Sequence, residues 1–257
     1  MQIRVLGAHN CESPQTKLVS LLVDQVLALD AGAITSSLSF SEQRQLKALL
    51  LTHHHFDHIR DLPTLGLNLY AQQCVEVYAP QHVIDIVSSC ILTDEIYMDF
   101  RSRPSRERPT FKLCPVEPHK ELKIQGYTVL PLPVNHGGGA AIGYQITSPD
   151  QKSIFYTGDT SRNSLSLWQK VSAQLLIMEL TMPNDSQELA EASSHLTPRL
   201  LREELCDIKR ARGSLPPIVT IHMRPEAEDK IREEIAEVAR ELKADITMGY
   251  EGMIITL

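Results

Sequence analysis

A cluster of four histidines and one aspartate constrains this chain more than any other feature of its sequence. The residues are, in order, His53-His54-His55-Phe56-Asp57-His58. They follow an apolar run over residues 47–52 that predicts a buried strand, so we expect them at the carboxyl end of that strand. The chain has ten histidines in all, and their concentration here argues against chance. The internal position also argues against an expression tag or a solvated histidine-rich loop.

The spacing within the cluster favours a metal site. On an extended segment alternate side chains share a face, so we expect His53, His55 and Asp57 to point the same way. His58 can join them where the chain turns, whereas His54 should face away and serve the structure. Neutral imidazole and carboxylate are ligands that suit zinc, iron and manganese. The cluster therefore predicts that the chain binds divalent metal.

Four further residues stand at the ends of other expected strands. They are Asp30, His136, Asp159 and His222. Any one of them alone is commonly a satisfied polar residue at a strand terminus, but all four together with the cluster indicate one shared site. The glycines at positions 137–139 would also let the backbone approach a metal or a substrate closely. His9, in the loop after the first expected strand, is a weaker candidate for a substrate contact.

The remaining elements favour an α/β fold, and we expect a single domain over residues 1–257. Two early runs joined by Asp24-Gln25 predict a β-hairpin. Thr197 as N-cap with Pro198 after it predicts a helix over residues 198–212, and an apolar stripe predicts another over residues 227–243. Shorter helices are expected over residues 41–46 and 81–90. The other expected strands lie at residues 75–79, 127–134, 141–147, 153–157, 175–180 and 218–221.

Composition excludes some classes of protein. The chain has 257 residues and a net charge of −7, which argues against a general nucleic-acid binder. Its five cysteines form no C-x-x-C pair, as is typical of reduced thiols. No apolar stretch approaches the roughly 20 residues that a membrane-spanning helix needs, so we expect a cytoplasmic protein.

The segment over residues 93–110 has no clear period. It contains Arg101, Arg103, Arg106 and Arg108 together with aromatic residues and prolines. Long irregular segments in compact domains are commonly lids, inserts or oligomer arms. Its arginines could bind phosphate, pair with a second subunit in a homodimer, or form a solvated charged surface.

The pattern H-x-H-x-D-H, a distant histidine, G-D-T and a late histidine resembles the metallo-β-lactamase superfamily along the whole chain. The resemblance implies a four-layer αββα sandwich of two mixed sheets flanked by helices, with the site at one edge. The implied ligands of one metal are His53, His55 and His136. Those of the other are Asp57, His58 and His222. Asp159 would bridge the two metals, and Asp30 matches a position that supports the ligands from behind.

The segments Glu179-Leu180-Thr181-Met182-Pro183-Asn184 and Ser194-His195-Leu196-Thr197-Pro198 carry a second resemblance. They are similar to motifs of the class II 3′,5′-cyclic-nucleotide phosphodiesterases, as is the ending over residues 221–225. This resemblance implies hydrolysis of cyclic AMP or cyclic GMP to a 5′-nucleotide with two divalent cations. We expect zinc, with manganese or iron as alternatives. Asp57 would orient the attacking water.

The same layout also resembles tRNase Z, in which a glutamate is paired with a histidine that protonates the leaving oxygen. His195 and Glu179 match these positions. The acidic chain lacks a Gly-Pro-rich arm to grip tRNA, which favours a small diester over tRNA. Other phosphodiesters, such as cyclic dinucleotides or 2′,3′-cyclic nucleotides, and an inactive metal-binding regulator remain as alternatives. Arg60-Asp61 departs from the superfamily pattern, where a glycine often follows the histidine motif.

Overall fold

Two mixed sheets organise the computed structural model, which describes residues 1–95, 97–137 and 141–257. The first sheet has the strand order β14 (Ile254–Thr256), β1 (Gln2–Gly7), β2 (Ser20–Val23), β3 (Leu27–Leu29), β4 (Ala48–Leu50), β5 (Val75–Pro80) and β6 (Phe111–Val116). The second has the order β13 (Ile246–Met248), β12 (Ile218–Ile221), β11 (Leu175–Glu179), β10 (Ser153–Tyr156), β9 (Ile142–Thr147), β8 (Tyr127–Pro133) and β7 (Leu122–Ile124).

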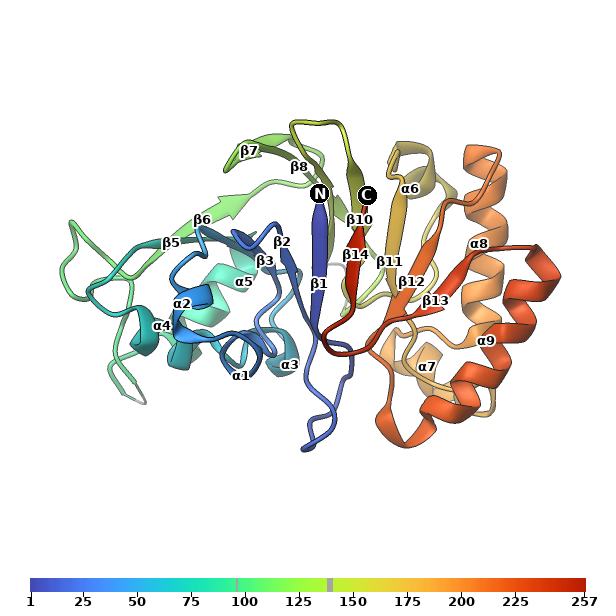
Figure 1. Ribbon diagram of the computed structural model, residues 1–257, viewed down its shortest axis with the longest axis horizontal. Coiled ribbons are helices and arrows are strands. Elements are labelled where there is room, and N and C mark those ends of the chain that lie inside the picture. Colours follow the sequence, from blue (N-terminus) through green and yellow to red (C-terminus); the bar gives the residue numbers. More distant parts are fainter. Residues whose placement is uncertain (96, 138–140) are drawn as a thin grey trace.

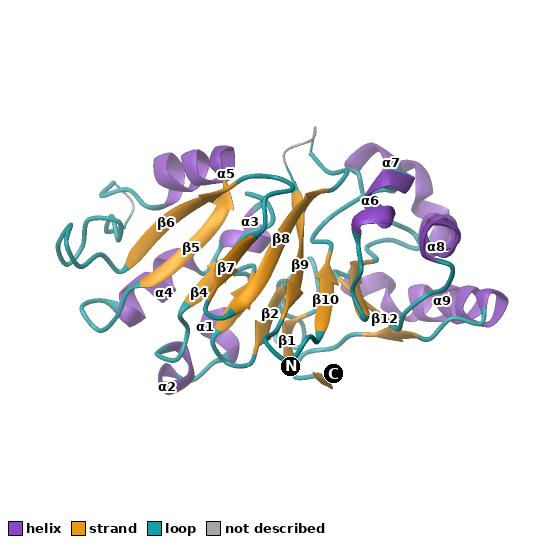
Figure 2. Ribbon diagram, turned by 90° about the horizontal axis from the view of Figure 1, so that it is seen from above, coloured by secondary structure: helices purple, strands orange, loops and turns teal. Residues whose placement is uncertain are grey.

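Helices flank both sheets, as the four-layer expectation requires. Those beside the first sheet are α1 (Ile34–Ser37), α2 (Phe40–Gln43), α3 (Phe56–Ile59), α4 (Leu62–Leu69) and α5 (Gln81–Ile86). Those beside the second are α6 (Leu165–Lys170), α7 (Gln187–Ser193), α8 (Pro198–Arg212) and α9 (Glu228–Leu242). Figures 1 and 2 show the two groups at opposite ends of the molecule, with the chain termini close together near the middle.

Strand alternation explains how the sheets pack. In β1 and β2, Ile3, Val5 and Leu21 join the core that includes the second sheet, whereas Leu6 and Leu22 join the core beneath α4 and α5. Because successive side chains of a strand point to opposite faces, one strand supplies both cores. Both faces of the first sheet are therefore buried over β2, β3 and β4.

Local signals located several elements well. The expected hairpin joins β2 and β3, and Asp24 and Gln25 have left-handed φ of 45° and 64°. The connection is one residue longer than expected, because Val23 pairs with Leu27 and Val26 also belongs to the turn. The Thr197 side chain accepts a hydrogen bond from the Leu200 backbone and caps α8 as expected. The helix expected over residues 41–46 is the shorter α2. The one expected over residues 81–90 continues from α5 as a π-turn at Val87–Ile91.

One expectation about the histidine cluster was wrong. The strand expected over residues 47–52 is the shorter β4, Ala48–Leu50, and the cluster does not stay extended to its end. The chain turns into α3 at Phe56, with His55 at the N-cap position, so a helical turn and not strand alternation places Asp57. Asp57 lies in the first turn of α3, where a carboxylate interacts favourably with the helix dipole.

The segment over residues 93–110 packs against the outer core of the first sheet. Phe100 is fully buried there. Its ring packs directly against Gly66, so closely that a Cβ at position 66 would lie 2.3 Å from the nearest ring atom. Arg101 pairs with Asp99 at 2.7 Å. Within the described residues, no part of this segment is among the residues that line the cavity at the histidine cluster. None of the helices in the described ranges is long and apolar enough to cross a membrane.

Candidate metal centre

The seven expected ligands converge from different elements into two adjoining groups. One group contains His53, His55, His136 and Asp159. The other contains Asp57, His58, Asp159 and His222. Within each group the nitrogen and oxygen atoms all lie within 4.8 Å of one another, and Asp159 belongs to both. These clusters of histidine and aspartate are compatible with a divalent metal centre.

The two oxygens of Asp159 face different histidines. Oδ1 lies 3.1 Å from Nε2 of His58 and 3.3 Å from Nε2 of His222. Oδ2 lies 3.6 Å from Nε2 of His53 and 3.9 Å from Nε2 of His136. A carboxylate placed in this way can contact two cations at once.

Several inward-facing atoms have no hydrogen bond although they are buried. Among the described residues, these atoms include Nε2 of His53, Nε2 of His58 and Oδ1 of Asp159. Buried polar groups without a partner are rare because leaving one unpaired costs about 1–3 kcal/mol. A cation between them would supply the missing partner, so the residues present fit a bound metal.

Asp30 holds two of these histidines from behind. Its Oδ2 lies 2.8 Å from Nδ1 of His58 and accepts a hydrogen bond of 2.6 Å from the Tyr156 hydroxyl. The Thr52 hydroxyl, 2.9 Å from the same oxygen, also lies 3.0 Å from Nδ1 of His53. Because Thr52 donates to Asp30, its oxygen can accept from His53, which leaves Nε2 of both histidines free to face inward.

Glu179 orients two further histidines, His222 through Thr181 and His195 directly. The Thr181 hydroxyl donates to Oε2 of Glu179 at 2.7 Å, and its oxygen lies 2.8 Å from Nδ1 of His222. Oε1 of Glu179 lies 2.8 Å from Nδ1 of His195. His222 has a φ of 70°, and its backbone N–H donates to the Ala8 carbonyl at 2.6 Å, which secures this left-handed residue.

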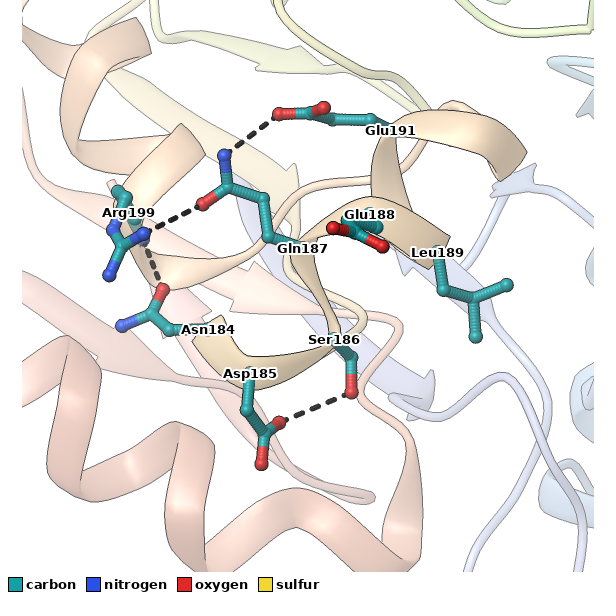
Figure 3. A pocket seen from close by; sticks show the side chains of 8 residues that line it. All are labelled: Asn184, Asp185, Ser186, Gln187, Glu188, Leu189, Glu191 and Arg199. Carbon is teal, nitrogen blue, oxygen red and sulfur yellow. Dashed lines mark hydrogen bonds between the residues drawn. The ribbon is translucent and has the colours of Figure 1, made fainter.

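His136 is oriented by the turn that follows α7. Its Nδ1 lies 2.9 Å from the carbonyl oxygen of Ser194, a residue with a φ of 60° at the end of that helix. Figure 3 shows a surface hollow over α7 in which polar side chains bond one another. Arg199 donates from its backbone to Oδ1 of Asn184 at 2.7 Å and from its guanidinium to Gln187 at 3.2 Å. These bonds tie α7 to the start of α8 and so support the turn that carries Ser194.

The side chains of the site differ in the direction in which their surroundings shift the pKa. Burial lowers the pKa of His53 well below its usual value, which favours the neutral imidazole that a metal ligand needs. Burial would also lower the pKa of His58, but the charges of Asp159 and Asp30 raise it well above its usual value. Burial would also lower the pKa of His195, but the charge of Glu179 and the hydrogen bond to it raise that pKa to about 9. Burial would raise the pKa of Asp57, but the charge of His58 and the hydrogen bond with His222 lower it.

A cavity of about 520 Å³ opens over the cluster. Its lining consists of Asn10, Cys11, Glu12, Leu18, His55, Phe56, Asp57, Arg60, Asp159, His195 and His222. The volume lies in the range of small-molecule sites, roughly 300–1,000 Å³. The cavity therefore gives a small ligand access to both groups of the cluster and to His195.

Some residues lie elsewhere than expected. His9 is buried between Glu251 and Glu228, at 2.6 and 3.2 Å, and does not line the cavity, so a substrate contact finds no support. His54, by contrast, lies outside both ligand groups, as expected. The centroid of its ring is 5.9 Å from that of the His82 ring. Gly138 and Gly139, expected to approach the metal, lie outside the described residues.

Sequence reasoning missed the four groups that orient the histidines from behind. These are Thr52, Tyr156, Thr181 and the Ser194 carbonyl. Thr52 directly precedes the histidine cluster, and Thr181 lies within the Glu179–Asn184 motif. Their places in or beside these motifs could have indicated that they support the site. Tyr156 and Ser194 had no signal of their own, because neither a tyrosine on a buried strand nor a backbone carbonyl is unusual.

Comparison with known proteins places these features in context. The family model described as "Beta-lactamase superfamily domain" matches residues 21–248. Unliganded yeast PDE1 has a TM-score of 0.85 at 18% identity, with 100% of this chain and 99% of that chain covered. The short form of human tRNase Z has a TM-score of 0.67 at 16% identity, with the same coverage of 100% and 99%. The two mixed sheets with flanking helices match the fold of these structures.

A curated relative matches over a shorter stretch. An octanoyltransferase of Porphyromonas gingivalis is 37% identical over 101 residues, which are 39% of this chain. The matched stretch is 19% of that protein, so this chain spans about a fifth of the length of the relative.

Proposed function

Because this chain belongs to the beta-lactamase superfamily, we propose that it is a metal-dependent phosphodiesterase that hydrolyses 3′,5′-cyclic nucleotides. The substrate would be cyclic AMP or cyclic GMP, and the product a 5′-nucleotide. The observation that carries the proposal is the carboxylate of Asp159, whose two oxygens face two separate groups of histidines. Such a layout suits a pair of cations across a phosphodiester.

The proposed cations are two divalent ions, with zinc as the first choice and manganese or iron as alternatives. His53, His55 and His136 would hold one, Asp57, His58 and His222 would hold the other, and Asp159 would bridge them. When bound, such a pair lowers the pKa of water from about 15.7 toward 7 and neutralises charge that develops on the phosphate. Asp30 would hold His58 in the tautomer that presents Nε2.

Two residues of the chain would move protons. Asp57 lines the cavity, and its lowered pKa keeps it ionised, so it can orient the attacking water and accept a proton. His195 lines the same cavity, and its pKa of about 9 keeps it protonated at neutral pH. His195 would donate that proton to the leaving 3′ oxygen, while Glu179 maintains its charge and orientation.

Three observations favour a cyclic nucleotide over a larger substrate. The motifs around Glu179 and His195 resemble those of cyclic-nucleotide phosphodiesterases, and the fold similarity to yeast PDE1 extends over the whole chain. The net charge of −7 opposes binding of a long polyanion. The fold similarity to human tRNase Z keeps precursor tRNA as the second candidate.

A substrate panel tests the proposal. Metal-loaded protein is incubated with cyclic AMP, cyclic GMP, a cyclic dinucleotide, a 2′,3′-cyclic nucleotide and precursor tRNA, and the products are separated by chromatography. We expect 5′-AMP or 5′-GMP as the main products. Cleavage of tRNA alone would replace the proposal with the nuclease alternative. Full metal occupancy without turnover of any substrate would favour a regulatory protein.

A further inference from the structure

Phe56 is a large apolar side chain left in solvent beside the candidate centre. It is 63% exposed, although its neighbours in sequence, His55 and Asp57, belong to the two ligand groups. The side chain lines the cavity over those groups. Phe40 is also 63% exposed, so exposure alone does not set Phe56 apart from other surface aromatic residues. Phe40, however, does not line this cavity. The position of Phe56, and not its exposure, therefore calls for an explanation.

The wall around Phe56 is already ordered. Arg60 is the C-cap residue of α3. Its side chain pairs with Glu12, and its Nε lies 3.3 Å from Oδ1 of Asp61. The Asn10 backbone donates to the Met223 carbonyl at 3.2 Å, which ties the facing loop to the end of β12. With its guanidinium bonded to two carboxylates, Arg60 braces the wall and contributes little free positive charge. The Phe56 ring is then a large apolar recognition surface of the cavity, beside Oδ1 of Asn10, which has no hydrogen bond among the described residues.

We propose that Phe56 is the platform on which the base of the nucleotide stacks while the diester lies over Asp159 and beside His195. The inference rests on the proposed function and adds the base subsite to it. Stacking on an aromatic ring tolerates every base because each base has a π-face. The platform therefore predicts that cyclic AMP and cyclic GMP bind with similar affinity, and that a cyclic diester without a base binds poorly.

Kinetics of matched variants test the platform. Stacking of the base should stabilise the bound substrate and the transition state equally. Phe56→Ala should therefore raise KM for cyclic AMP about tenfold or more, with a smaller effect on kcat. The loss should be much smaller with trimethylene phosphate, a six-membered cyclic diester that has no nucleoside. Phe56→Tyr should restore KM. Phe40→Ala, which removes an equally exposed ring on α2, should behave as the unchanged protein on both substrates.

Fluorescence tests stacking without turnover. Trp168 is the chain's one tryptophan and is fully buried, so Phe56→Trp introduces a single exposed reporter. Saturable quenching by adenosine 5′-monophosphate, with little quenching by ribose 5-phosphate, is the expected result. Equal quenching by both compounds, or equal losses of Phe56→Ala on cyclic AMP and trimethylene phosphate, would overturn the inference. Absence of cyclic-nucleotide hydrolysis by the unchanged protein would instead refute the proposed function, because the fluorescence readout needs no catalysis.

Discussion

Nδ1 of His195 lies 2.8 Å from Oε1 of Glu179, and that carboxylate is almost fully buried. The imidazole also stacks on His222, with ring centroids 5.3 Å apart. One carboxylate thus serves both an expected proton donor and, through Thr181, an expected metal ligand. In the proposed roles of these residues, proton transfer by His195 and metal binding by His222 would be coupled through Glu179.

His195→Ala should lower kcat for cyclic AMP by roughly 10²–10⁴, the contribution typical of a general acid. The variant should lose much less on a p-nitrophenyl phosphodiester, because p-nitrophenolate leaves without protonation. Steady-state kinetics on the two substrates, with metal content held equal, checks the prediction. Equal losses on both would remove His195 from the role of proton donor.

Thr181→Val should weaken metal binding by about 10–100-fold, the effect typical of losing a group that orients a metal-binding histidine. Valine keeps the shape of threonine but cannot accept from Nδ1 of His222, so the imidazole loses its fixed tautomer. Competition with a chelator measures the change without relying on activity. Thr220→Val is the matched control, because Thr220 is equally buried and its hydroxyl has no hydrogen bond among the described residues. Similar affinities in the two variants would contradict the assigned role of Thr181.

Asp159→Ala should abolish turnover and reduce bound metal at both positions, since its two oxygens face both groups. Asp57→Ala should also abolish turnover, but it should spare the group formed by His53, His55 and His136. Elemental analysis after loading and desalting should therefore find more metal in the Asp57 variant than in the Asp159 variant. Unchanged activity in either variant would refute the two-metal scheme.

Ionisation of Glu204 should make the fold less stable as the pH rises from acidic values toward neutrality. Its buried carboxylate accepts from Nε1 of Trp168 at 2.8 Å and from the Asn163 backbone at 2.9 Å. Burial raises its pKa to about 7 against the lowering effect of these bonds. A raised pKa in the folded state gives stability that is complete below the pKa of the unfolded chain and is lost as the pH rises toward 7.

Glu204→Gln keeps an accepting oxygen and removes the ionisation. Between pH 6 and pH 8, the unchanged protein should lose about 1 kcal/mol more stability than this variant. Urea unfolding at the two pH values measures the difference. If the two proteins change in parallel, the carboxylate does not titrate in this range.

Much of the site follows from local chemistry along the chain. The residue types of H-x-H-x-D-H favour a metal site, because neutral imidazole and carboxylate are common metal ligands. The hairpin at Asp24-Gln25 and the cap at Thr197 depend on a few neighbouring residues, so pattern and propensity locate them. The division of ligands into two groups was implied by the resemblance to the metallo-β-lactamase superfamily, and the two clusters have the same membership.

Other features depend on residues that are distant in sequence, and local patterns carry no information about them. His222 and Asp57 are 165 positions apart yet lie 3.1 Å from each other, and Tyr156 reaches Asp30 across 126 positions. The identity of the residues predicted imidazole and carboxylate ligands for a metal, and the two clusters are compatible with that prediction. Folding established which nitrogen of His58, His136 and His222 faces inward, because the partners of their Nδ1 atoms come from distant strands and turns. Packing also placed Asp57 on a helical turn and left the Phe56 ring in the cavity, since both outcomes depend on what surrounds α3 in space.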